Sequence, residues 1–440
     1  MISLRYFYRL VIAYIRRFKA IILLGIISGI SIFILLNIFS DTFLKNKTKI
    51  VGITGRYHTD NLPHFILNEI SEGLTQIEDD GTIVPNLASS WESPDSGKSW
   101  IFTIAPGNLW QDNEPVTSES IIYEFSDVVV EKPDLKTIIF KLKDPFSPFP
   151  AVVSRPTFKS GLLGTGNWKV TDIKISGIYI ESLSIKDKNR NNKIYKFYPT
   201  EENTKQAFII GEVDEIKDLY EPSPIDKWNT SINSELISYN KIVTIFFNIE
   251  DKLLSQKSLR QALAYAINKD VLAGERAISP ISKNSWVFNP SVKPYNYSVP
   301  RANELLEELQ DQTKQDLSIT LVSSPLLLDT AEKIAKDWEE IGVKTTVLVS
   351  SITPSQYQAY ITIIDIPIDP DQYAFWHSTQ EAANISNYSD PRIDKLLEDG
   401  RAELNLEDRR GIYLDFQRYL VEDSPAAFLY YPKTYSITRK

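Results

Sequence analysis

The longest apolar stretch of the chain lies close to its N-terminus. Residues 20–39 (AIILLGIISGISIFILLNIF) contain no charged side chain. As a helix rising ~1.5 Å per residue they would extend ~30 Å, which matches the hydrocarbon thickness of a bilayer. This run predicts one transmembrane helix. A cleaved signal peptide stays open as the alternative, although the run is long and no Ala-x-Ala cleavage site follows it.

Beyond that run the pattern changes to short segments that are typical of a mixed α/β protein. KIVGITG (49–55) is a β-branched run that ends in glycine and predicts a strand followed by a turn. Apolar and polar positions alternate at 98–105 and 178–198 and predict strands there. The segment 178–198 is interrupted by DKNRNNK (187–193), which predicts a hairpin turn.

The second half of the chain alternates strands with amphipathic helices. LSITLV (317–322) and VKTTVLV (343–349) are predicted strands. Between them, Asp329 can cap a helix that Gly342 ends, so the segment forms a βαβ unit. Further helices are predicted at 258–272, 301–310, 391–403 and 407–421.

The charge distribution separates the N-terminus from the rest. The 440 residues include 48 basic and 57 acidic side chains, a net charge of −9. Residues 1–40 carry five basic residues and no acidic one, so the remaining 400 carry −14. The positive-inside rule therefore predicts a cytoplasmic basic segment at 1–19 and places 41–440 outside the cytoplasm. A body this acidic is a poor nucleic-acid binder, because phosphate needs a basic face.

Composition limits the class of protein further. A chain of 440 residues exceeds one average core, so two or three domains are expected. With 42% hydrophobic and 24% charged residues it is neither disordered nor a multi-span membrane protein. The absence of cysteine excludes disulfides, thiolate metal sites, a cysteine nucleophile and a lipidated cysteine anchor.

Catalytic and cofactor motifs are absent from the sequence. The three histidines, His58, His64 and His377, form no HExxH motif, and no Walker or G-x-S-x-G sequence occurs. We therefore expect no enzyme, no catalytic residue, no cofactor and no metal site. Carboxylate pairs are numerous, so an anchored hydrolase stays open as an alternative.

The most suggestive local stretch is ITIIDIPIDPDQYAFWHSTQ (361–380), in which an apolar strand ends at Asp365. Further carboxylates and aromatic rings follow within a few residues. Together they suit a cationic or amine-bearing ligand, through charge pairing and cation–π contact. The alternative is a solvated turn with Trp376 packed in the core. The candidates for ligand contact are Asp365, Asp369, Tyr373 and Trp376.

Several segments share residues, in a common order, with one known family. In residues 70–125 the shared positions are Gly73, Leu74, Pro85, Leu87, Ala88, Trp91, Trp110, Asp112 and Thr117. Later matching segments are 164–170, 211–216, 246–272, 387–401 and 422–431. These segments resemble the bacterial extracellular solute-binding proteins of family 5, the oligopeptide and dipeptide receptors of ABC importers.

The resemblance implies an α/β fold like that of periplasmic binding proteins, with two lobes joined by a hinge and an extra subdomain. It would follow the N-terminal transmembrane helix. The ligand would lie between the lobes, where pockets often form. Carried onto this sequence, the boundaries are 48–70, 161–242 and 429–440 for lobe I, 71–160 for the extra subdomain and 243–428 for lobe II.

The resemblance also bears on the candidate site. In peptide-binding members an aspartate three residues before an Asp/Glu-Pro pair captures the α-ammonium of the peptide. The pair here is Asp369–Pro370, but the position three residues earlier is Ile366, and Asp365 lies one residue further away. Three options stay open: a bulge restores the role to Asp365, Asp369 or Asp371 takes it, or free amino termini are not read.

The function implied by the resemblance is that of a membrane-anchored, extracytoplasmic receptor. It would bind peptides and deliver them to the permease and ATPase subunits of an ABC importer, and we expect a monomer. The same fold could instead bind a non-peptide solute or sense a signal peptide, and a scaffold with a filled cleft is a further alternative.

Overall fold

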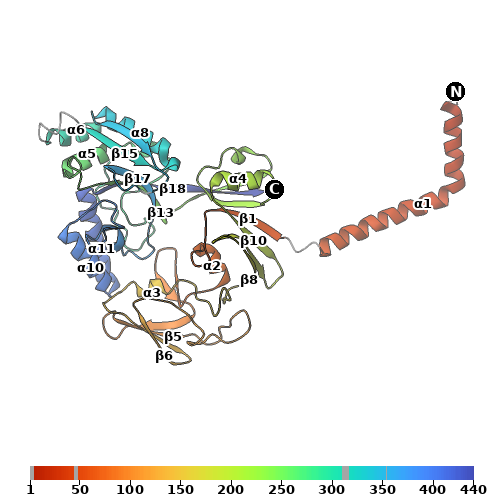
Figure 1. Ribbon diagram of the computed structural model, residues 1–440. Helices are drawn as coiled ribbons and strands as arrows, with labels where there is room; N and C mark the ends of the chain where they lie inside the picture. Colours follow the sequence, from red (N-terminus) through yellow and green to blue (C-terminus); the bar gives the residue numbers. More distant parts are fainter. Residues whose placement is uncertain (1–3, 44–47, 310–316, 353) are drawn as a thin grey trace.

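The computed structural model describes residues 4–43, 48–309, 317–352 and 354–440. A long N-terminal helix stands apart from a body of three parts (Figure 1). This helix, α1 (Leu4–Phe43), is interrupted at Phe18, where φ −110° and ψ 16° are not helical. Its segment Arg17–Ile34 is long and apolar enough to cross a membrane, and no part of it is buried against the body.

The first lobe is built on a sheet with parallel central strands. β1 pairs in parallel with both β10 and β11, and β10, β9 and β8 continue the sheet as antiparallel neighbours. The elements are β1 (Thr48–Thr54), α2 (His64–Ile70), β8 (Trp168–Ser176), β9 (Tyr179–Asp187), β10 (Asn192–Tyr198), α4 (Glu201–Ile209), β11 (Glu215–Leu219), η1 (Ile225–Lys227) and β12 (Ser231–Ile237). The predicted hairpin between β9 and β10 is confirmed, and the Asp187 carboxylate accepts a hydrogen bond from the Asn191 backbone N–H at 2.8 Å.

The extra subdomain lies below both lobes in Figure 1 and has a hydrophobic core of its own. The aromatic rings of Phe102, Phe140 and Phe149 meet in that core, with the last two centroids 4.9 Å apart. Its four-stranded sheet has the order β4-β5-β7-β6. The elements are β2 (Thr75–Ile77), β3 (Ile83–Pro85), β4 (Ala88–Glu92), β5 (Ser99–Ile104), β6 (Val129–Asp134), β7 (Thr137–Lys141) and α3 (Phe149–Val152).

The second lobe holds the largest hydrophobic cluster among the described residues. The predicted βαβ unit is confirmed there, because β15 and β16 are parallel neighbours joined through α8. The elements are β13 (Lys241–Phe247), α5 (Lys257–Ala266), η2 (Lys269–Val271), β14 (Gly274–Arg276), α6 (Val299–Glu307), β15 (Ser318–Ser323), η3 (Pro325–Leu327), α8 (Leu328–Glu340), β16 (Lys344–Val349), β17 (Ala359–Asp365), α9 (Tyr373–Trp376), α10 (Pro391–Ala402), α11 (Leu406–Asp423) and β18 (Ala426–Arg439).

Two neighbouring segments of the chain cross between the lobes: strand β18, and the connection from β12 to β13. The first part of β18 pairs with β13 of the second lobe, and its last part pairs with β11 and β12 of the first lobe. The chain also passes from β12 into β13 through residues 238–240, opposite the middle of β18. This pair of crossings joins the two lobe sheets into one continuous ladder, with the order β16-β15-β17-β13-β18-β11-β1-β10-β9-β8.

Two predicted helix boundaries were wrong. The helix predicted at 258–272 ends as α5 at Ala266, because Ile267 takes extended backbone angles of φ −77° and ψ 120°. Asp329 does not cap α8, whose N-cap position is Leu327. Asp329 instead lies in the first turn, where a negative charge suits the helix dipole.

A third helix begins earlier than predicted. The Ser298 side chain accepts a hydrogen bond from the Arg301 backbone N–H, so α6 starts at Val299 rather than at residue 301. Residue 310, the predicted end, lies outside the described residues.

Candidate ligand site between the two lobes

Parallel strands of each lobe end at the junction between the lobes. In the first lobe the strands β1, β10 and β11 run in the same direction, and in the second lobe β15 and β17 do so. In open α/β sheets, ligands bind in the crevice outside the carboxyl ends of such strands. A ligand in this crevice would therefore contact the residues that follow these strand ends.

Tyr57, Asp218 and Tyr220 form the first-lobe side of this junction. Burial raises the pKa of the Tyr57 hydroxyl, and the charge of Asp218 raises it further. Asp218 has φ +58°, a left-handed conformation that is uncommon for a residue other than glycine and often marks a functional position. Gly55, with φ +132°, lets the Tyr57 ring fold back over β1, because a Cβ there would lie 2.6 Å from the Tyr57 hydroxyl.

Asp365 ends β17 on the second-lobe side. Its side chain is 81% exposed, and its Oδ1 lies 2.5 Å from the Lys241 Nζ at the start of β13. The neighbouring Ile366 is 5% exposed and faces the core. The family pattern expects the aspartate at position 366, and here it stands at 365. Because successive residues of an extended chain point to opposite sides, Asp365 faces solvent while Ile366 faces the core.

Asp365 also acts on the opposite lobe. Burial raises the pKa of the Tyr220 hydroxyl, and the negative charge of Asp365 raises it further, followed by that of Asp218. A carboxylate of the second lobe is thus close enough to a tyrosine of the first lobe to shift its titration. The structure therefore brings Asp365 to the lobe junction, beside the crossing strands.

Asp369 has very different surroundings. It receives two hydrogen bonds from Arg409, at 2.6 and 2.9 Å, and the two side chains are only 11% and 5% exposed. Burial alone would lower the pKa of Arg409, but the charge of Asp369 and its hydrogen bonds raise it. The Asp369 charge is neutralised within the second lobe and ties the loop after β17 to α11.

Tyr373 and Trp376 are held by neighbours in the same lobe. The Arg401 guanidinium lies 3.8 Å from the Tyr373 ring centroid, and Arg401 Nε also donates to Asp371 at 2.9 Å. Trp376 is fully buried, and its indole N–H donates to the Gln372 side chain at 3.2 Å. Ligand contact by Asp369, Tyr373 and Trp376 stays a prediction from the sequence.

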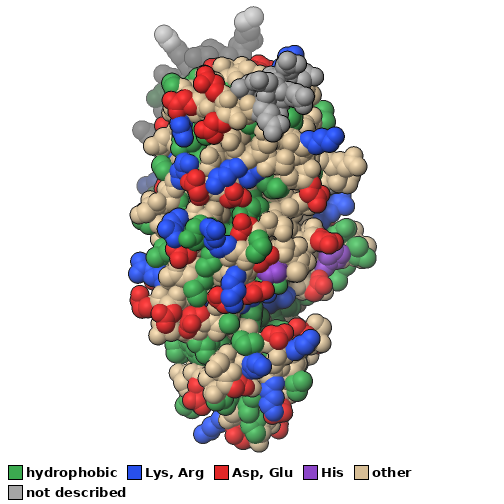
Figure 2. Space-filling model, turned by 90° about the vertical axis from the view of Figure 1, so that its left-hand side faces the viewer, with side chains coloured by type: hydrophobic (Ala, Val, Ile, Leu, Met, Phe, Trp, Pro, Cys, Tyr) green, Lys and Arg blue, Asp and Glu red, His purple; other side chains and the backbone are tan. Residues whose placement is uncertain are grey.

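The extra subdomain closes against the second lobe. The Trp286 backbone N–H donates to the Asp80 carbonyl at 3.0 Å, and the Ser147 N–H donates to the Arg401 carbonyl at 2.6 Å. Figure 2 shows this side of the molecule, with basic and acidic side chains interspersed and a narrowing where the two parts meet. A pocket of about 450 Å³ lies in this seam, and the first lobe contributes none of its lining residues, which include Trp91, Trp100, Trp286, Asp369 and Arg409.

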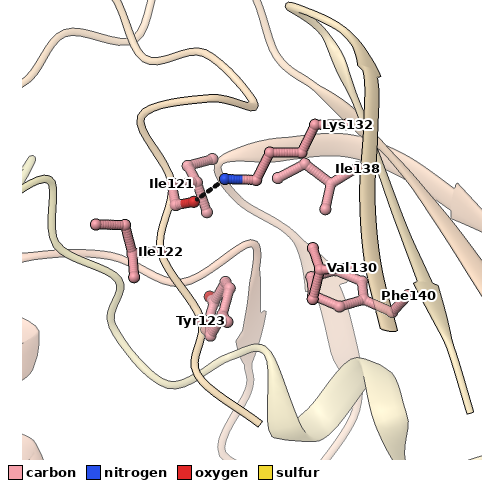
Figure 3. A pocket seen from close by; sticks show the side chains of 7 residues that line it. All are labelled: Ile121, Ile122, Tyr123, Val130, Lys132, Ile138 and Phe140. Carbon is pink, nitrogen blue, oxygen red and sulfur yellow. Dashed lines mark hydrogen bonds between the residues drawn. The ribbon is translucent and has the colours of Figure 1, made fainter. Parts of the chain in front are cut away.

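A smaller pocket of about 280 Å³ lies within the extra subdomain, away from the strand ends (Figure 3). The Lys132 ammonium crosses it and donates to the Ile121 carbonyl at 2.8 Å. Its walls are mostly apolar side chains of the subdomain: Ile121, Ile122, Tyr123, Val130, Ile138 and Phe140. None of its lining residues lies at the lobe junction.

The histidines lie apart from one another. His58 is in the first lobe with its Nδ1 2.9 Å from the Ile178 carbonyl, whereas His377 is buried in the second lobe beside Tyr373. Within the described ranges no group of three or more His, Asp or Glu side chains is arranged to hold a metal ion.

Sequence reasoning missed Tyr57, Asp218 and Tyr220. The available signal was the position of these residues along the chain: Asp218 and Tyr220 lie at and just after the end of β11, which begins within GEVDEI (211–216), and Tyr57 lies just beyond the turn after β1. Only the pairing of β1 with β11 shows that these residues share one edge.

Comparison with known proteins places the chain among binding proteins. The family model described as bacterial extracellular solute-binding proteins, family 5 Middle, matches residues 125–383. The dipeptide-binding protein of Escherichia coli (strain K12) is 21% identical over 444 residues, covering 81% of this chain and 82% of its own length. The nickel-binding periplasmic protein of the same organism is 22% identical over 452 residues, covering 84% of each chain.

Solved structures share the fold. NikZ from Campylobacter jejuni, in complex with Ni(L-His), matches with a TM-score of 0.74 and 20% identity, over 90% of this chain and 94% of its own. The oligopeptide-binding protein AppA from Bacillus subtilis, in complex with a nonapeptide, matches with a TM-score of 0.69 and 18% identity, over the same shares of 90% and 94%.

Proposed function

The chain belongs to the bacterial extracellular solute-binding proteins of family 5, and from this premise we propose that it is a receptor that binds peptides between its two lobes. The relatives named above include a dipeptide-binding and an oligopeptide-binding protein as well as a nickel-binding one. The receptor would perform no chemistry, and ATP hydrolysis would belong to the partner subunits of an ABC importer. It would act as a monomer and hand its ligand to the permease.

One observation supports the peptide proposal above others. Asp365 presents an exposed carboxylate at a strand end, and its charge acts on Tyr220 of the opposite lobe. A peptide α-ammonium bound there would gain a charge-assisted hydrogen bond, while contacts with both lobes would favour the closed state. Backbone hydrogen bonds along an extended peptide would then allow varied side chains.

The other predicted site residues have supporting roles in this proposal. The ion pair between Asp369 and Arg409 fixes the loop that follows β17. Burial of Trp376 fixes the same loop. Tyr373 is held over Arg401 at the same loop. Asp365 is the residue that we propose for direct ligand contact.

We propose that residues 20–39, within α1, anchor the receptor in the cytoplasmic membrane. Residues 1–19 would stay in the cytoplasm, and 41–440 would lie outside it. Tethering would keep the receptor at a high effective concentration near its permease. We propose the same boundaries as before: lobe I comprises 48–70, 161–242 and 429–440, the extra subdomain 71–160, and lobe II 243–428. The hinge would lie where β18 and the connection from β12 to β13 pass between the lobes.

Native mass spectrometry of the full-length protein, purified in detergent, tests this function. A mixed population of short co-purifying peptides is the expected result. Calorimetric titration with a library of dipeptides to nonapeptides should then give saturable binding to one site. A co-purifying non-peptide solute, with no binding from the library, would reject the peptide receptor and leave the fold with another ligand.

A further inference from the structure

We propose that residues 4–17 form an amphipathic helix that lies along the cytoplasmic surface of the membrane and binds the phosphate headgroups of anionic lipids. The inference rests on the anchor proposed above. It adds a second membrane contact, different in chemistry from the apolar span, that would fix the N-terminal end of the anchor at the headgroup level.

The bend in α1 separates these two elements. At Phe18 the backbone leaves the helical region, and Figure 1 shows two arms that diverge there. The whole of α1 has 40 residues, which at ~1.5 Å per residue is ~60 Å, about twice the hydrocarbon thickness of a bilayer. One straight span cannot use that length, whereas a span plus a surface arm can.

The short arm has two opposite faces. At 100° per residue, positions 5, 9 and 16 fall within a narrow sector, and all three are arginine. Positions 7, 11, 14 and 18 fall on the opposite side of the helix. They are Phe7, Val11, Tyr14 and Phe18. The rings of Tyr14 and Phe18 lie 4.6 Å apart along this side.

An anionic bilayer surface fits both faces. A helix with a basic face and an aromatic, apolar face lies in the membrane interface, with its apolar side among the acyl chains. Residues 1–19 hold five basic and no acidic side chains, which complements a negatively charged leaflet. In the structure Tyr14 is 62% exposed and Ile15 is 50% exposed, so the body does not cover them. Placing this arm across the bilayer instead would bury its four arginines in hydrocarbon.

The cysteine-free chain allows a direct test. Single cysteines placed one at a time at positions 4–17 of the full-length protein each accept one spin label. The labelled proteins are reconstituted in nanodiscs of phosphatidylcholine alone or with phosphatidylglycerol. Relaxation by oxygen and by a water-soluble nickel chelate then reports the depth of each label.

The expected result is a depth pattern with a period of 3.6 residues, deepest at positions 7, 11 and 14 and shallowest at 5, 9 and 16, in the anionic nanodiscs. Replacing Arg5, Arg9 and Arg16 by Gln should lower the ratio of surface-bound to unbound arm roughly 100-fold, since each arginine contributes roughly five-fold to that ratio. The matched control replaces three basic residues of the β9–β10 hairpin, Lys186, Lys188 and Arg190, by Gln and should leave the pattern unchanged.

Labels that are water-exposed at every position, or lipid-exposed at every position, would overturn the proposal. An equal pattern with and without phosphatidylglycerol would reject the recognition of anionic lipid. A label at Ile27 distinguishes failure of the anchor from failure of the surface helix. A shallow, water-exposed label at Ile27 would reject the anchor itself. A deep label at Ile27 with no periodicity at 4–17 would reject the surface helix alone.

Discussion

Asp365 ends β17 and Asp369 lies four residues further on, in the loop that follows, yet the structure gives them opposite surroundings. Asp365 is 81% exposed and pairs with a lysine that is itself 32% exposed. Asp369 is 11% exposed and is held by two hydrogen bonds from a buried arginine. The first carboxylate can exchange its partner for a ligand at little cost, and the second cannot.

The difference shows that two carboxylates of the segment 361–380 have different roles. An exposed ion pair contributes about 0–1 kcal/mol, so a ligand ammonium can displace Lys241 from Asp365 without unfolding anything. Removing one partner of a buried pair leaves a charge without compensation and costs far more. Asp369 and Arg409 therefore fix the loop, and Asp365 is free to bind.

Among the variants that test the difference between Asp365 and Asp369, Asp369→Asn should have the largest effect on stability. The substitution leaves the Arg409 charge buried without its counterion, and we expect the free energy of unfolding to fall by about 3–5 kcal/mol. Chemical denaturation measures it. Asp371→Asn is the matched control: Asp371 is as buried as Asp369, at 12% against 11% exposed, but its partner Arg401 is 31% exposed and stays partly solvated, so a loss of about 1 kcal/mol is expected. Equal losses for the two variants would show that burial of the arginine does not decide the cost.

Two lysines extend the comparison to pH. Lys241 is partly exposed beside a carboxylate, whereas Lys269 is 5% exposed and donates only to the Ala264 and Tyr295 carbonyls, at 2.5 and 2.9 Å. Burial, helped by the nearby charge of Arg276, lowers the pKa of Lys269 from 10.5 to about 7.

The sign of the pH effect follows from these two values. Between about pH 7 and 10.5 the unfolded chain keeps the Lys269 proton and the folded protein does not, so stability rises with pH in that window. A gain of about 2–3 kcal/mol is expected from pH 7 to 9. Denaturation series at several pH values should show this slope in the parent and a flatter one in Lys269→Met. An unchanged slope in the variant would show that the titration of Lys269 does not produce it.

The local pattern predicted most elements of the second lobe. The order of strand, amphipathic helix and strand placed β15, α8 and β16. The helix predicted at 391–403 corresponds to α10, where the Asp390 carboxylate accepts hydrogen bonds from two backbone N–H groups. These features depend on neighbours within a few residues. The early end of α5 was missed because local helix propensity continues past Ala266 while the chain turns.

The lobe junction could not be predicted in the same way. It depends on β12 and β18 pairing across 200 residues, for example Ser231 with Arg439, and on β11 lying beside β1. The resemblance and the strand end drew attention to Asp365. Tyr57, Asp218 and Tyr220 became visible only once that pairing had brought their strand ends to one edge.

The central claim is that Asp365 reads a free peptide amino terminus between the lobes. Calorimetric titration of full-length Asp365→Asn with a matched pair of peptides, one with a free amine and one acetylated, tests it most directly. Lys241→Gln is the control, because it frees the Asp365 carboxylate and should leave or slightly raise the affinity for the free amine. We expect the Asn variant to bind the free-amine peptide about 10-fold more weakly, the loss of one charge-assisted hydrogen bond, with the acetylated peptide unchanged. Equal weakening of both peptides, or no weakening of either, would contradict the claim.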